Sequence, residues 1–123
     1  AFELDQEFLD ARKIYAVSAI FAGKPDLAKE IMKDDGGVII ADDRFLRAFA
    51  EKNDLKSVIA VLNKFLEENS DDIPHRLNLA ATYVQVNERA KAIKELEIII
   101  TKEPGFKEQG EYYIKEIKAG RNP

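Results

Sequence analysis

The sequence has no cysteine, and among its 123 residues there is one histidine and one methionine. Without cysteine the chain has no disulfide, no zinc–thiolate site and no thiol redox chemistry. A single histidine, His75, excludes the His/Cys clusters that hold transition metals. We therefore expect no cofactor. His75 lies at a predicted helix start among charged neighbours, and we expect it to be a surface residue.

The sequence also lacks a long apolar run and an excess of positive charge. No run approaches the 18 residues of a membrane-spanning helix, so we expect no span in this segment. Nineteen Lys and Arg against 23 Asp and Glu give a net charge of −4, and phosphate contacts need a clustered basic face. Nucleic-acid binding is therefore not expected. The composition, 46% apolar and 34% charged, indicates a folded, water-soluble segment and leaves the compartment open.

Motifs for catalysis or ion binding are missing as well. No serine lies with a histidine and an acid in a triad pattern, and Gly36-Gly37 is not followed by the GK[ST] of a phosphate loop. We expect no enzyme activity. Three acidic pairs lack the spacing of a calcium loop. Two of them lie near helix starts, where carboxylates cap backbone N–H groups, and one lies in a solvated loop: Asp42-Asp43, Asp71-Asp72 and Asp34-Asp35 respectively.

Apolar residues at helical spacing predict helices along the chain. The first covers about Leu4 to Phe21, with a buried stripe that we expect to consist of Phe8, Leu9, Ile14, Tyr15, Val17, Ile20 and Phe21. The second covers Pro25–Lys33 and ends before Gly36-Gly37, which can take the left-handed cap conformation. Further helices are expected near Ile73–Val86, Glu88–Glu103 and Phe106–Ala119, and a second repeat with its own helix pair is expected to begin near Ile39.

These helices repeat. Residues 71–104 form one helix–turn–helix unit whose packing positions are Leu79, Ala80, Tyr83, Ala92 and Leu96. The same offsets recur 34 residues upstream at Phe45, Leu46, Phe49, Val58 and Leu62, and 30 residues before those at Tyr15, Ala16, Ala19, Ala28 and Met32. Four missing residues are about one helical turn, so we expect a shortened second helix in the first unit. Asn53 and Asn87 fall in the turns, where asparagine tolerates positive φ.

The pattern resembles the tetratricopeptide repeat (TPR) family. The resemblance implies an all-α fold, a right-handed superhelical array of about three TPR-like helix–turn–helix pairs plus a C-terminal capping helix. We expect one domain over residues 1–123, with repeats at about 4–37, 38–70 and 71–105 and the terminal helix at about 106–119. Since Ala1 begins the chain and Met32 is its only methionine, we expect a processed chain or an excised domain.

In the TPR family the first helices of the repeats line a concave groove. Carried over by position, the resemblance implies a partner-binding groove made of Lys13, Val17, Phe21, Arg44, Arg47, Ala50, Leu77, Asn78, Ala81 and Gln85. Arg44 and Arg47 share one helix face, and arginine can bind a carboxylate through two hydrogen bonds. Alternatively, these arginines pair with Asp43, Glu51 or Asp10. The family's chaperone clamp is not predicted, because only Lys13 matches one of its five positions.

The expected function is that of a protein–protein interaction module, which binds a peptide or partner segment in the groove. The expected partner carries acidic residues or a C-terminal carboxylate. One alternative is self-association through the open first helix, where Phe2, Leu4 and Phe8 would meet another copy or a missing preceding helix. A second rests on the tail FKEQGEYYIKEIKAGRNP, which is similar to the C-terminal soluble portion of bacterial O-antigen ligase-type membrane proteins. That similarity implies an accessory domain of a membrane-associated glycopolymer ligase.

Overall fold

A computed structural model describes residues 2–123 and the side chains from Asp5 onwards. This part of the chain consists of seven α-helices and one 3₁₀ helix, without a strand, which confirms the all-α prediction. Contacts within the chain divide it into two compact units, residues 1–64 and 65–123. The superhelical TPR arrangement stays a prediction.

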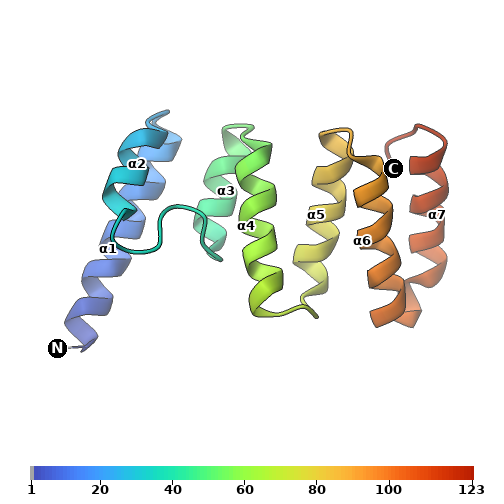
Figure 1. Cartoon of the computed structure of the whole chain (residues 1–123), viewed down its shortest axis with the longest axis horizontal. Helices are drawn as coiled ribbons and strands as arrows, with labels where there is room; N and C mark the ends of the chain where they lie inside the picture. Colours follow the sequence, from blue (N-terminus) through green and yellow to red (C-terminus); the bar gives the residue numbers. More distant parts are fainter. Residues whose placement is uncertain (1) are drawn as a thin grey trace. The chain divides into compact units, whose positions relative to one another are not determined.

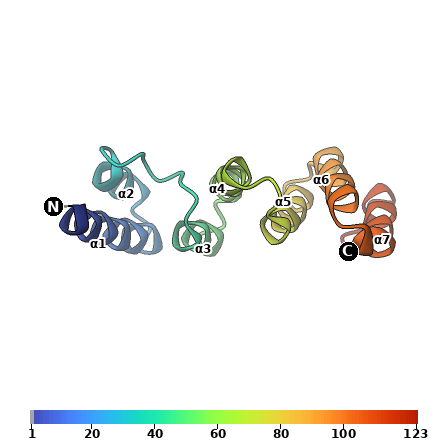
Figure 2. The same cartoon turned by 90° about the horizontal axis from the view of Figure 1, so that it is seen from below.

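Unit 1 begins with two packed helices. α1 (Phe2–Phe21) and α2 (Pro25–Met32) lie side by side (Figures 1 and 2), and α3 (Asp43–Glu51) also contacts α1. α4 (Leu55–Glu68) begins in this unit and ends in the next. With 8 residues, α2 is shorter than α4 with 14, which confirms the shortened second helix.

The core of unit 1 follows the repeated offsets. Small residues of α1 and α2 are buried, and so is Ile20 of α1. The buried residues at the predicted offsets are Ala16, Ala19, Ala28, Met32, Phe45, Leu46, Phe49, Val58 and Leu62. The prediction of this core from the spacing is therefore confirmed, except at its first position.

That first position, Tyr15, was expected to be buried like Leu79 and is exposed. Three further members of the predicted stripe, Phe8, Ile14 and Phe21, are exposed as well. The helix itself is correctly predicted, but its buried side is wrong for these four residues. They lie on a side of α1 that is exposed in the described part of the chain, whereas Ala16, Ala19 and Ile20 are buried and α1 packs against α2 and α3.

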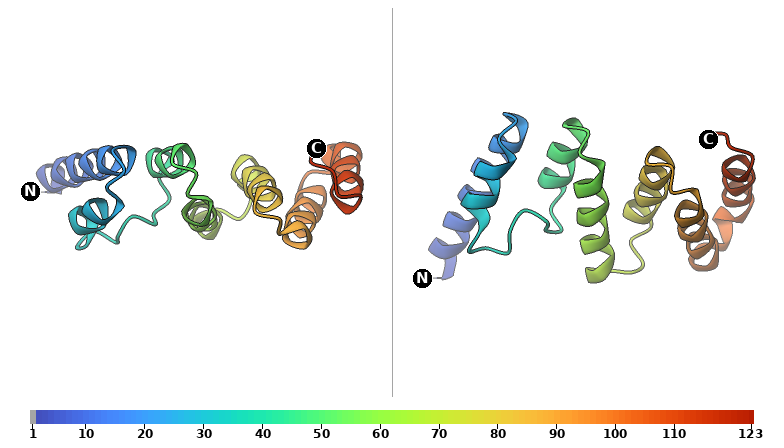
Figure 3. Two further views of the ribbon diagram at one scale, coloured as in Figure 1. Left: turned by 90° about the horizontal axis from the view of Figure 1, so that it is seen from above. Right: turned by 45° about the horizontal axis from the view of Figure 1, so that its top comes forward.

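Unit 2 contains α5 (Ile73–Gln85), α6 (Arg89–Lys102), a 3₁₀ turn (Pro104–Phe106) and α7 (Lys107–Lys118). α5 packs against α6 and α6 packs against α7, and Figure 3 shows the three helices following one another. Its core is formed by Ala80, Ala92, Leu96, Ile99 and Ile117. Ala80 of α5 and Ala92 of α6 are small residues in this core, and they let the two helices approach closely, as the spacing predicts.

The turns and helix starts use the residues that the sequence indicates. Asn53 and Asn87 have φ values of 56° and 61°, which confirms their predicted conformation. Asp42 accepts a hydrogen bond from the Arg44 N–H at 2.8 Å, and Asp72 accepts one from the His75 N–H at 3.2 Å. Both carboxylates therefore cap helices.

Two polar residues differ from expectation. His75 is half-buried and not fully on the surface: its ring stacks on Phe65 at 3.8 Å and its Nδ1 lies 2.6 Å from Asp72 Oδ2. Asp35 is not merely solvated, because Arg12 donates two hydrogen bonds to it at 2.6 and 3.0 Å. These hydrogen bonds lower the pKa of the Asp35 carboxyl. Neither contact is visible in the local sequence pattern, since one depends on ring stacking and the other joins residues 23 apart.

Candidate functional site

Unit 2 contains a hollow of about 430 Å³ between α5, α7 and the segment that follows α7. We call it the α5 hollow. Its lining is formed by Leu77, Ala80, Ala81, Val84, Gln85, Leu96, Tyr113, Ile117, Asn122 and Pro123. Leu77, Ala81 and Gln85 are exposed, so the hollow is open to solvent along α5.

α5 presents an uncharged surface to this hollow. From Leu77 to Gln85 the sequence is LNLAATYVQ, nine residues without a charge in a chain of which 34% is charged. Leu77, Ala81 and Val84 are spaced by four and three residues and therefore share one helix face. A solvated helix face is usually polar or charged. The neutral, partly apolar face of α5 is thus typical of a surface that contacts something other than water.

The floor of the α5 hollow is apolar and close-packed. Leu96 of α6 and Ile117 of α7 are almost fully buried, and both belong to the core of unit 2. Ala80 and Ala81 leave space because their side chains end at Cβ. No side chain in the lining carries a charge, so the hollow fits an uncharged apolar group better than a carboxylate.

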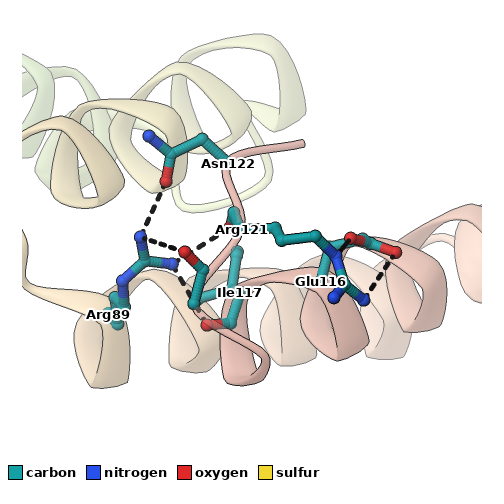
Figure 4. Close-up of polar contacts among 6 residues, drawn as sticks. Arg89, Glu116, Ile117, Arg121 and Asn122 are labelled. Carbon is teal, nitrogen blue, oxygen red and sulfur yellow. Dashed lines mark hydrogen bonds and ion pairs between the residues drawn. The ribbon is translucent and has the colours of Figure 1, made fainter.

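One wall of the hollow is held by Arg89, the first residue of α6 (Figure 4). Its guanidinium donates to the carbonyl oxygens of Ile117 and Arg121 at 3.1 and 3.0 Å, and to that of Gly120 at 3.3 Å. It also donates to Asn122 Oδ1 at 2.7 Å. The last carbonyls of a helix have no hydrogen-bond partner within the helix, and a cation near them is also attracted by the negative end of the helix dipole. Arg89 therefore caps α7 and positions Asn122.

The segment after α7 is turned back by two further contacts. Gly120 has a φ of 84°, a conformation that glycine adopts without strain, and its N–H donates to the carbonyl of Ile117. Arg121 forms an ion pair with Glu116 (Figure 4), and the hydrogen bonds from Arg121 lower the pKa of the Glu116 carboxyl. Together these contacts keep Asn122 and Pro123 at the α5 hollow.

Three of the four groove residues predicted in this unit, Leu77, Ala81 and Gln85, line the α5 hollow. The fourth, Asn78, is exposed on α5 but is not part of the lining. Sequence reasoning missed the contributions of α7 and of the segment after it. Tyr113 and Ile117 lie 34 residues after Leu79 and Tyr83, so the repeat spacing is the signal that could have found them, whereas nothing local to Asn122 or Arg89 indicates their contact.

In unit 1 the predicted residues Lys13 and Arg44 meet at a carboxylate. Arg44 donates to Asp42 at 2.8 and 3.1 Å, and its other terminal nitrogen lies 3.0 Å from Asp10 Oδ1. Lys13 Nζ lies 3.9 Å from Asp42 Oδ2. The hydrogen bonds lower the pKa of Asp42 and raise that of Arg44. Arg44 thus follows the alternative in which the arginine pairs with acids of its own unit, Asp10 among them.

The remaining predicted residues of unit 1 form no such cluster. Arg47, Phe21 and Ala50 are exposed, and Val17 is half-buried. That these residues and those of unit 2 line one groove stays a prediction. Phe2 and Leu4, expected to take part in self-association, lie outside the side chains that the structure describes.

Neither a metal site nor a membrane span is found in the described part of the chain. No group of three or more His, Cys, Asp or Glu side chains among the described residues could hold a metal ion. None of the helices described is long and apolar enough to cross a membrane. Comparisons with protein-family models, with curated proteins and with solved structures found no match to this chain.

Proposed function

We propose that this chain is a protein–protein interaction module and that the α5 hollow receives an apolar side chain from a partner segment. The observation that carries the proposal is the uncharged lining of the hollow, continued along α5 by the neutral run from Leu77 to Gln85. A volume of about 430 Å³ lies within the range of pockets that bury ligand groups.

The occupant that fits this surface is a peptide with a branched aliphatic or aromatic side chain. Gln85 lines the hollow and Asn78 lies outside the lining on the same helix, and each side-chain amide can donate and accept hydrogen bonds. A peptide backbone offers the complementary groups between its side chains. No cation in the lining offers a site for an acidic anchor, since Arg89 is committed to the end of α7. The proposed contact is therefore neutral.

A displayed library of random 12-residue peptides tests this proposal. Peptides are selected on the wild-type chain and then screened against Ala81→Arg, which places a long charged side chain in the hollow. Ala90→Arg is the matched control, because Ala90 is also an exposed helical alanine and does not line the hollow. Circular dichroism checks that both variants remain helical.

Burying one large apolar side chain contributes roughly 1.5–3 kcal/mol, or about a ten- to hundredfold change in affinity. We expect selected peptides to be rich in Leu, Ile or Phe and to lose at least tenfold in affinity for Ala81→Arg, with no change for Ala90→Arg. If no selected peptide distinguishes the two variants, the α5 hollow is not the binding site.

A further inference from the structure

The side of α1 that faces away from α2 and α3 carries four exposed large apolar residues. Phe8, Ile14, Tyr15 and Phe21 are 55%, 50%, 68% and 39% exposed. Unit 1 thus displays on a single helix most of the large apolar side chains that it leaves in solvent.

This side of α1 is almost free of charge. At 100° per residue, one half of the helix between residues 7 and 22 is formed by Glu7, Phe8, Ala11, Ile14, Tyr15, Ser18, Phe21 and Ala22, and only Glu7 is charged. The opposite half is already packed through Ala16, Ala19 and Ile20. The outward half, with large apolar side chains and a single charge, is typical of a helix side that another element covers. We therefore expect a second helix to cover α1.

The outward residues are also spaced as in a coiled coil. Phe8, Ala11, Tyr15, Ser18 and Ala22 follow one another at intervals of three, four, three and four residues, the repeat of a seam in which side chains of two helices interlock. Large and small residues alternate along this seam. The helix that covers it must therefore present small residues opposite Phe8 and Tyr15 and large residues opposite Ala11 and Ser18.

We propose that the covering helix is α1 of a second copy of this chain, in antiparallel orientation. In one antiparallel register, the numbers of the residues that face each other sum to 26. Phe8 then lies opposite Ser18 of the partner subunit, and Tyr15 lies opposite Ala11 of the partner subunit. Each large side chain then meets a small one, and the two-fold symmetry repeats both pairs. A parallel pair would oppose Phe8 to itself and Tyr15 to itself, crowding these layers and leaving gaps at the alanine and serine layers.

The seam from Phe8 to Ala22 is short. Fourteen helical steps span roughly 21 Å, so the interface lies at the small end for specific complexes. We expect a reversible dimer with a dissociation constant on the order of micromolar.

Sedimentation velocity of the 123-residue chain over a concentration series tests the dimer. We expect the wild-type chain to pass from monomer to dimer with concentration, and Tyr15→Glu to weaken association at least tenfold. Tyr112→Glu is the matched control, because Tyr112 is an exposed tyrosine of α7 and its substitution leaves the seam intact. A wild-type chain that stays monomeric at several hundred micromolar, or a dimer insensitive to Tyr15→Glu, overturns the proposal.

Cysteine cross-linking tests the orientation, since the chain has no cysteine of its own. Phe8→Cys and Ser18→Cys are prepared as separate chains and oxidised alone and as a mixture. The antiparallel register brings residue 8 of one chain near residue 18 of the other, so we expect a disulfide dimer mainly in the mixture. Cross-linking of each variant with itself as readily as with the other, or no cross-linking above a Tyr112→Cys control, overturns the antiparallel pairing.

Discussion

Arg76 of α5 is a charged side chain that the fold buries almost completely. It is 8% exposed, and its guanidinium donates to Glu95 Oε1 of α6 at 2.7 Å and to the carbonyl oxygen of Ser70 at 2.9 Å. Its Nε has no partner. Burying two charges is favourable only while each stays paired. The pair therefore joins α5 to α6 and to the preceding loop, and the loss of either member leaves a charge unpaired.

We expect Arg76→Leu to lower the free energy of unfolding by about 3 kcal/mol, since removing one partner of a buried pair costs about that much. The double variant Arg76→Leu/Glu95→Leu should recover most of the loss, because no unpaired carboxylate remains. Urea unfolding of wild type, the two single variants and the double variant measures both values. A double variant as unstable as Arg76→Leu would contradict this role of the pair.

Gly110 lies where α7 meets α6. A Cβ atom at this position would lie 2.7 Å from Ile100 Cγ1 and 2.9 Å from Phe106 Cε1. Crowding of this kind costs about 1–3 kcal/mol, whereas alanine in a helix gains up to about 1 kcal/mol over glycine. We expect Gly110→Ala to lower the stability by about 1 kcal/mol in urea unfolding. Gly105→Ala is the control, since its Cβ would meet open space; a stabilised Gly110→Ala would contradict the close packing.

At the level of helices, α3 depends on the carboxylate of Asp42. This group caps the helix and receives hydrogen bonds from the Arg44 side chain, which lower its pKa below the ordinary value of 3.8. A carboxyl whose pKa is lower in the folded state stabilises the fold at pH above its unfolded pKa. That contribution is lost as the pH falls through the folded value.

Asp42→Asn separates charge from capping, because asparagine caps helices about as well as aspartate. Arg44 is partly exposed, so we expect a loss of no more than about 1 kcal/mol at pH 7. The difference in the free energy of unfolding between Asp42→Asn and wild type should shrink below about pH 4. Thermal unfolding between pH 7 and pH 2 measures it, with Asp26→Asn in the first turn of α2 as the control. A difference that does not depend on pH would show that the ion pair is not its cause.

The stability of α7 depends on a cation, Arg89, at the C-terminal end of the helix. Arg89→Gln removes the donors that reach the last carbonyls of α7 and Asn122. We expect a stability loss of about 1 kcal/mol, at the upper end for a cation at a helix C-terminus, and faster amide hydrogen exchange at Gly120 and Arg121. Lys94→Gln is the control, because it removes an exposed positive charge from α6, the helix that begins with Arg89. Unchanged exchange at Gly120 would mean that Arg89 does not hold this segment.

Considering the entire chain, the features that sequence predicts well are those decided by neighbouring residues. The φ values of Asn53 and Asn87 and the closely packed Ala80 and Ala92 follow from turn chemistry and spacing. For the five helices whose bounds were predicted, α1, α2, α5, α6 and α7, the bounds agree within about two residues, as at α5, which was expected to end at Val86 and ends at Gln85. In each case the residues that determine the feature lie within one short segment of the chain.

The features that the sequence does not predict depend on which residues of other helices pack against a segment. The periodicity of α1 marks an apolar helix but does not tell which half is covered, so Tyr15 was placed in the core. Arg89 reaches residues 28 to 33 positions away, and such a contact exists only once α6 and α7 have packed. Leu77, Ala81 and Gln85, which were predicted as groove residues, line the α5 hollow together because they share one helix. The other walls of the hollow come from α6, α7 and the segment after α7, which no local pattern around α5 indicates.

Removal of residues 107–123 tests how far the two compact units depend on each other. The deletion takes away α7, whose Ile117 completes the core that Leu96 and Ile99 form in unit 2. End elements of a helical array protect neighbours that cannot bury their apolar side alone. We expect amide hydrogen exchange to accelerate by at least tenfold in α5 and α6. The amides of α1 and α3, whose contacts lie within unit 1, should exchange at nearly unchanged rates. Equal acceleration in all four helices, measured by mass spectrometry of proteolytic fragments, would instead show that the chain unfolds as one cooperative body.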